Sequence, residues 1–96
     1  MTRGEILAWL DTRRPVPPAA LRERLERVAG DAALPLPAHL AELGRELLAR
    51  VVSRPAGGRE LALDLLAADA FVTYAFEAQA EDGVGNLAHL AEESVS

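Results

Sequence analysis

The sequence predicts an all-α fold, a compact bundle of four main helices within a single domain that spans residues 1–96. Three observations lead to this prediction. Alanine and leucine, both strong helix formers, supply 35 of the 96 residues. Apolar residues recur at helical spacing in four segments. Clusters of proline and glycine separate these segments from one another.

The first two helices are predicted at residues 2–12 and 18–29. Thr2 and Glu5 have the spacing of a capping box, which satisfies free backbone donors at a helix start. A stiff connector follows, because three of the four residues at 15–18 are proline. Pro18 suits the first turn of the second helix, and Gly30 suits its end.

The third and fourth helices are predicted at residues 37–53 and 59–82. The third carries one apolar stripe at nearly heptad spacing, made of Leu36, Leu40, Leu43, Leu47 and Val51. Proline and glycine at 55–58 separate the two helices. The glycines at 83 and 85 are expected to end the fourth helix, after which Asn86 can cap a short fifth helix near residues 86–92.

The fourth helix is apolar on two nearly opposite faces, since fifteen of the twenty residues at 61–80 are apolar. The other three predicted helices are short, and together they can cover only one of these two faces well. We therefore expect the second face to meet another copy of the chain; complete enclosure by its own chain is the alternative. The residues assigned to this interface are Leu63, Ala67, Ala70, Phe71, Tyr74 and Ala78. The residues assigned to the chain's own core are Leu61, Leu65, Ala68, Val72, Ala75 and Phe76.

Composition and charge exclude several classes of function. The net charge of −5 opposes non-specific binding to nucleic acid. Acidic residues interrupt the segment at 61–80, so we expect no membrane span. Cysteine is absent, and all ten basic residues are arginine, a bias that GC-rich bacterial coding sequences give without any function. We expect a cytoplasmic acidic protein with no cofactor.

The function predicted from these patterns is that of a soluble interaction module. We expect a homodimer that acts as an accessory or adaptor protein rather than an enzyme, because no nucleophile can be matched with a base. An acidic protein partner could bind a basic face formed by Arg13, Arg14, Arg22 and Arg24.

The alternative function is binding of a small ligand or a metal ion. Asp69, Thr73 and Glu77 form a polar stripe on the fourth helix. These acids can equally form structural ion pairs with nearby arginines, namely Arg45, Arg50, Arg54 or Arg59. A pentapeptide at 38–42 recurs at 88–92 and places a histidine three residues before a glutamate. The helical wheel puts His39 and His89 on charged faces, so no metal site is predicted.

Overall fold

The structure is a computed structural model that describes residues 1–53 and 58–95, with side chains described up to residue 83. It contains α1 (Arg3–Leu10), α2 (Ala19–Val28), α3 (Leu36–Ser53) and α4 (Arg59–Val95), and these described ranges contain no strand. The all-α prediction is confirmed. Each of the four helices begins within one residue of its predicted start.

The capping box predicted for the first helix is present at the start of α1. The Glu5 backbone N–H donates to Thr2 Oγ1 at 3.1 Å, and the Thr2 backbone N–H donates to Glu5 Oε1 at 3.2 Å. The N-terminal amine also donates to the Ala32 carbonyl oxygen at 2.9 Å. These bonds satisfy the free donors at the helix start and attach it to the loop between α2 and α3.

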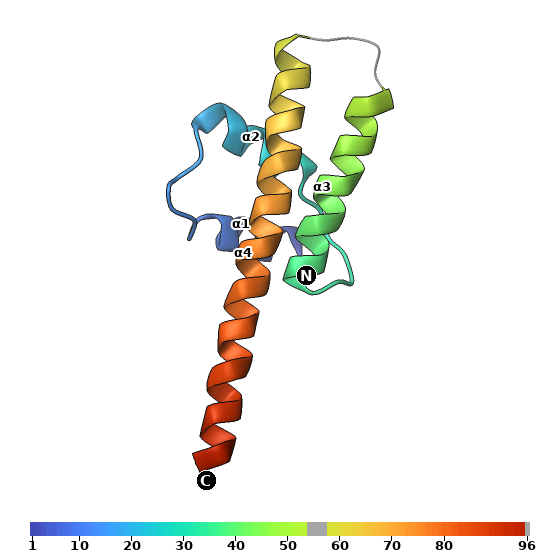
Figure 1. The fold of residues 1–96 in the computed structure, drawn as a ribbon. Coiled ribbons are helices and arrows are strands. Elements are labelled where there is room, and N and C mark those ends of the chain that lie inside the picture. Colours follow the sequence, from blue (N-terminus) through green and yellow to red (C-terminus); the bar gives the residue numbers. More distant parts are fainter. Residues whose placement is uncertain (54–57, 96) are drawn as a thin grey trace.

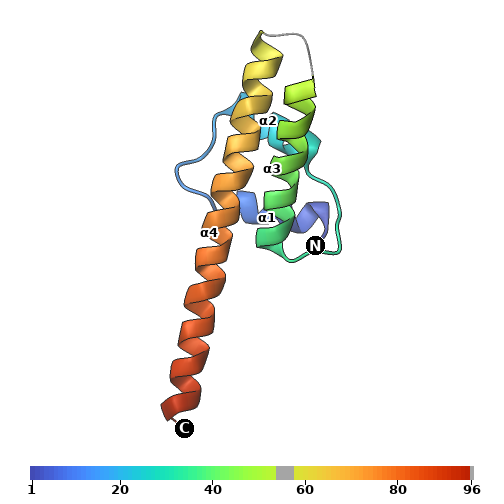
Figure 2. The same cartoon turned by 45° about the vertical axis from the view of Figure 1, so that its right-hand side comes forward.

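The centre of the fold is an antiparallel pair of helices, α3 and α4, which lie side by side in both views (Figures 1 and 2). The α1 and α2 helices lie across one side of this pair. Leucines of α3 and the Phe71 side chain of α4 fill the core between the layers, where Ile6, Leu10 and Leu25 from α1 and α2 join them. This one-sided arrangement leaves the other side of the α3–α4 pair open.

The predicted end of the fourth helix and the predicted fifth helix are both wrong. The α4 helix continues without a break from Arg59 to Val95. A glycine inside a helix costs only about 1 kcal/mol relative to alanine, whereas a proline would stop it. No proline follows Pro55 in the sequence. The last part of α4 therefore extends past the other three helices, and the chain measures 59 × 24 × 19 Å (Figure 1).

Candidate interaction surface

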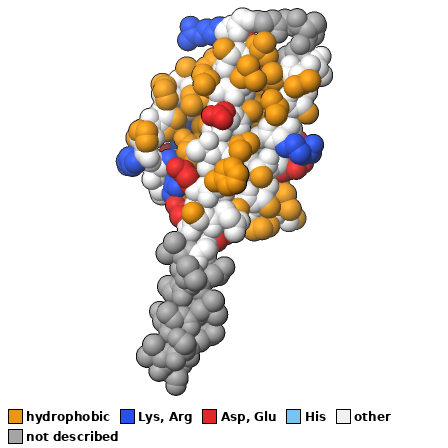
Figure 3. Space-filling model, in the orientation of Figure 1, with side chains coloured by type: hydrophobic (Ala, Val, Ile, Leu, Met, Phe, Trp, Pro, Cys, Tyr) orange, Lys and Arg blue, Asp and Glu red, His pale blue; other side chains and the backbone are white. Residues whose placement is uncertain are grey.

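Large hydrophobic side chains are exposed on the open side of the α3–α4 pair. They are Leu48 and Val52 on α3 and Leu65, Val72 and Phe76 on α4; Leu66 of α4 is also exposed but lines neither of the hollows described below. Phe76 is 73% exposed and Val52 is 77% exposed. Figure 3 shows hydrophobic side chains gathered over this pair of helices. Single exposed hydrophobic residues are common on proteins, but a group on one face marks an interaction site.

Two adjoining hollows run along this side and form what we call the α3–α4 groove. The first has a volume of about 490 Å³ and is lined by Ala41, Gly44, Arg45, Leu48, Leu65, Ala68, Asp69 and Val72. The second has a volume of about 310 Å³ and is lined by Pro37, Ala38, Ala41, Val72, Ala75, Phe76 and Gln79. Because Ala41 and Val72 line both, the hollows form one continuous groove.

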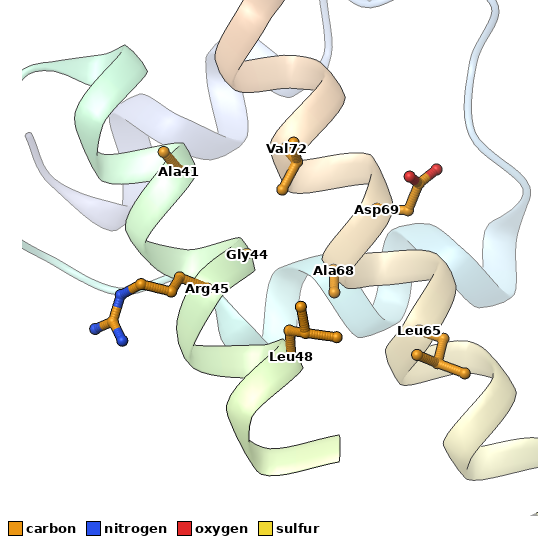
Figure 4. A pocket seen from close by; sticks show the side chains of 8 residues that line it. All are labelled: Ala41, Gly44, Arg45, Leu48, Leu65, Ala68, Asp69 and Val72. Carbon is orange, nitrogen blue, oxygen red and sulfur yellow. The ribbon is translucent and has the colours of Figure 1, made fainter. Parts of the chain in front are cut away.

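The floor of the groove is made of small residues where the two helices approach most closely. Gly44 is buried, and a β-carbon added to it would lie 3.2 Å from the Ala68 carbonyl oxygen. In Figure 4, Leu48 and Leu65 lie on either side of the groove and Val72 lies further along it. Since Gly44 and Ala68 have little or no side chain, the larger residues stand above them as walls.

One charge of each sign lies at the rim of the groove. Arg45 comes from α3 and Asp69 from α4, and their side chains point away from each other on opposite sides (Figure 4). Arg45 pairs with Glu42 on its own helix, and this hydrogen bond lowers the pKa of Glu42 and raises that of Arg45. Asp69 is exposed and forms no ion pair with any residue in the described ranges. The rim therefore offers a partner the Asp69 carboxylate as a hydrogen-bond acceptor and the Nη1 group of Arg45 as a donor, since Nε and Nη2 of Arg45 already donate to Glu42.

The α4 residues predicted to form the interface lie mainly in the protein's own core. Ala67 and Phe71 are fully buried, Ala78 is 1% exposed, and Leu63, Ala70 and Tyr74 are partly buried. Of the residues assigned to the core, Ala68 and Ala75 are buried, whereas Leu65, Val72 and Phe76 are exposed at the groove. The large hydrophobic side chains left exposed at the groove therefore lie on the face that contains Phe76, not on the face that contains Phe71. The reason is that α1 and α2 pack on the Phe71 side, which a helical wheel cannot show.

The proposed ligand stripe is not gathered into one site. Asp69 and Thr73 are exposed, and Asp69 lies at the groove. Glu77 instead forms an ion pair with Arg13, which follows α1 in the sequence. The distance from Glu77 Oε2 to Arg13 Nη1 is 3.5 Å. Glu77 is therefore in an ion pair with an arginine, but this is Arg13 and none of the four arginines proposed as partners. Asp69 remains open to a partner.

Three of the four arginines proposed as a basic face form ion pairs within the chain, and the fourth, Arg14, donates to the carbonyl oxygens of Asp11 and Arg13. Arg13 pairs with Glu77 and Glu81, and Arg22 pairs with Asp11 and Glu26. Arg24 reaches Glu60 and lies 3.1 Å from the buried carboxylate of Asp64. The hydrogen bond to Glu60 raises the pKa of Arg24 and lowers that of Glu60. These arginines hold α1 and α2 to the rest of the chain. Their ion pairs also neutralise most of the positive charge on the face that was proposed to bind an acidic partner.

A cluster around the single tryptophan joins the first helix to α4. The Arg13 guanidinium carbon lies 3.8 Å from the centre of the Trp9 ring, and Trp9 meets Tyr74 edge to face at 5.9 Å. Trp9 Nε1 and Arg13 Nη2 both donate to the Glu81 carboxylate, at 3.1 Å and 2.6 Å, and lower its pKa. Burial raises the pKa of Tyr74. No local sequence pattern marks this cluster, because its members are up to 72 residues apart.

His39 lies in the interior, not on a charged face. Its side chain is 3% exposed, and Nδ1 has no hydrogen-bond partner. Burial lowers its pKa, and the N-terminal amine lowers it further. The N-terminal amine thus lies near enough to affect His39, a proximity in space that the helical wheel could not show. The His89 side chain lies outside the described residues.

Comparisons with known proteins give no relative: no family model, curated protein or solved structure matches this chain. Within the part of the chain that the structure describes, no helix combines the length and apolar character needed to cross a membrane. The same described residues contain no group of three or more histidines and acids that could hold a metal ion.

Proposed function

We propose that this chain is a helical interaction module that self-associates through the α3–α4 groove and serves as an accessory or adaptor protein. The observation that carries the proposal is the row of exposed hydrophobic side chains on one side of the α3–α4 pair. Burying such side chains against a partner removes apolar surface from water, at about 25 cal/mol for each Å². The helix implicated is the one that the sequence predicts, but the contacting face is the one that contains Phe76.

A binding role also agrees with the chemistry of the groove. Its floor and walls are apolar, and its charged groups stand at the rim, as in protein–protein interfaces with an apolar centre and a polar edge. A partner that fits here offers a row of apolar side chains flanked by charges of both signs. A second copy of the same surface has that chemistry.

Sedimentation equilibrium over a range of concentrations tests the proposal. We expect wild-type protein to associate as its concentration rises. The Leu48→Ser variant removes a groove wall and should raise the dissociation constant at least tenfold. Leu66→Ser is the matched control, because Leu66 is similarly exposed but does not line the groove. A monomer at every concentration, or equal effects of both variants, would contradict the proposal.

A small apolar ligand is the second candidate occupant of the groove. The larger hollow, at about 490 Å³, has the size of many ligand sites, which span roughly 300–1,000 Å³. Asp69 at its rim would select a ligand with a cationic or hydrogen-bond-donating group. Ala41→Trp would fill both hollows. Saturable binding of an apolar fluorescent probe that this variant abolishes would support the ligand site, whereas unchanged binding would remove it.

A further inference from the structure

We infer that two copies associate about a two-fold axis that runs along the α3–α4 groove. In this arrangement α3 of each copy lies over α4 of the other, and Arg45 of each pairs with Asp69 of the other. The inference rests on the proposed self-association and specifies its geometry. Two antiparallel helix pairs joined in this way form a four-helix bundle, a stable way to bury one apolar side of each pair.

The choice of axis follows from where the two charges lie. Arg45 and Asp69 line the same hollow from opposite helices, so they lie at about the same height along the pair (Figure 4). A two-fold rotation about an axis parallel to the helices leaves the position of each residue along the helix direction unchanged. It also places α3 of the second copy opposite α4 of the first, and α4 of the second copy opposite α3 of the first. It therefore brings Arg45 beside Asp69 of the second copy, and by symmetry it does so twice.

A two-fold axis across the helices gives the opposite electrostatic result. Suppose that this axis crosses the helices at right angles, at the height of the rim charges. Each helix then faces the same helix of the second copy, so Arg45 meets the second copy's Arg45 and Asp69 meets its Asp69. Like charges placed together at an interface oppose association and so select against that arrangement. The positions of one arginine and one aspartate thus favour the axis along the groove.

The shapes of the side chains agree with the same axis. Phe76, the large exposed residue of α4, shares its hollow with Pro37, Ala38 and Ala41 of α3. Since heights are kept, the rotation places Phe76 above the same three small residues of the second copy. A large side chain then meets small ones, and aromatic side chains in such positions often supply much of the binding energy.

A charge-exchange experiment tests this geometry. We would prepare Arg45→Asp and Asp69→Arg, check that each has wild-type helicity by circular dichroism, and measure association alone and in an equimolar mixture. Each single variant places like charges at both contacts, so its dissociation constant should rise at least tenfold. The mixture restores both opposite-charge contacts, so native mass spectrometry should show the heterodimer in excess over either homodimer. The Arg45→Asp/Asp69→Arg double variant should also regain association.

Matched controls separate this geometry from a general effect of charge. Arg50→Asp and Asp82→Arg make the same changes at exposed positions of α3 and α4 that do not line the groove, and they should leave association unchanged. If wild type dimerises but the exchanged variants neither weaken nor complement each other, this axis is wrong while the proposed self-association stands. A monomeric wild type overturns both.

Discussion

A β-carbon added to Gly44 of α3 would lie 3.0 Å from Val72 Cγ2 of α4 and 3.2 Å from the Ala68 carbonyl oxygen. The backbones of the two helices therefore lie so close together at the centre of the groove that a side chain at position 44 would meet the α4 backbone. The residue that permits this approach is the smallest one available, and a backbone oxygen cannot turn aside as a side chain can. The depth of the groove depends on this single position.

Replacing Gly44 with alanine should destabilise the protein by about 1–2 kcal/mol. Overpacking a tight contact costs roughly 1–3 kcal/mol, and the higher helix propensity of alanine returns up to about 1 kcal/mol. Urea unfolding followed by circular dichroism measures the change. Gly83→Ala is the control, because a β-carbon there has no neighbour within 4 Å. That variant should gain about 0.5–1 kcal/mol, and a loss equal to that of Gly44→Ala would refute the close-contact explanation.

Among the ion pairs of the described side chains, the one between Arg24 and Asp64 should be the most costly to break. Asp64 is 1% exposed, and Arg24 Nη1 lies 3.1 Å from its Oδ1 atom. Removing one partner of a buried pair costs about 3–5 kcal/mol, since the buried charge that remains loses a favourable ion pair. We expect Arg24→Ala to lose about 3 kcal/mol in urea unfolding. Arg27→Ala is the surface comparison: its pair with Glu23 is 62% exposed on both sides and should contribute less than about 1 kcal/mol.

How far the sequence predicts this structure depends on the range over which each interaction acts. The capping box of Thr2 and Glu5 is local, and the structure confirms it. The end of the fourth helix depends on whether Gly83 stops a helix, and the cost of one glycine is too small to decide this. The choice between the Phe71 and Phe76 faces depends on where α1 and α2 pack, which a helical wheel does not contain. A glycine at position 44, inside an otherwise leucine-rich helix, was the available signal for a close helix contact.

Acid should weaken the contact between the first helix and α4. Arg13 and Trp9 hydrogen-bond to Glu81 and hold its pKa below its ordinary value of 4.5. A lowered pKa in the folded state means that this stabilisation is present above pH 4.5 and is lost as the pH falls through the folded-state pKa. Because Glu81 is half exposed, the effect should stay below about 1 kcal/mol.

The fluorescence of Trp9, the single tryptophan, reports this titration directly. We expect a transition with a midpoint below pH 4.5 in the wild-type protein and no such transition in Glu81→Gln. A midpoint at or above 4.5, or a transition that persists in the variant, would show that the contact does not control the titration.

His39 should make the fold less stable at mildly acidic pH. Burial and the N-terminal amine lower its pKa from the ordinary 6.5, so the unfolded chain takes up the proton at a higher pH than the folded chain does. The free energy of unfolding is therefore at its full value above pH 6.5. It declines as the pH falls from 6.5 towards the folded-state pKa, by up to about 1.4 kcal/mol per pH unit for one proton. Urea unfolding between pH 8 and pH 5 should show this slope in the wild-type protein and in His89→Gln. The His39→Gln variant should lack it, and a slope that survives in that variant would assign the effect to another group.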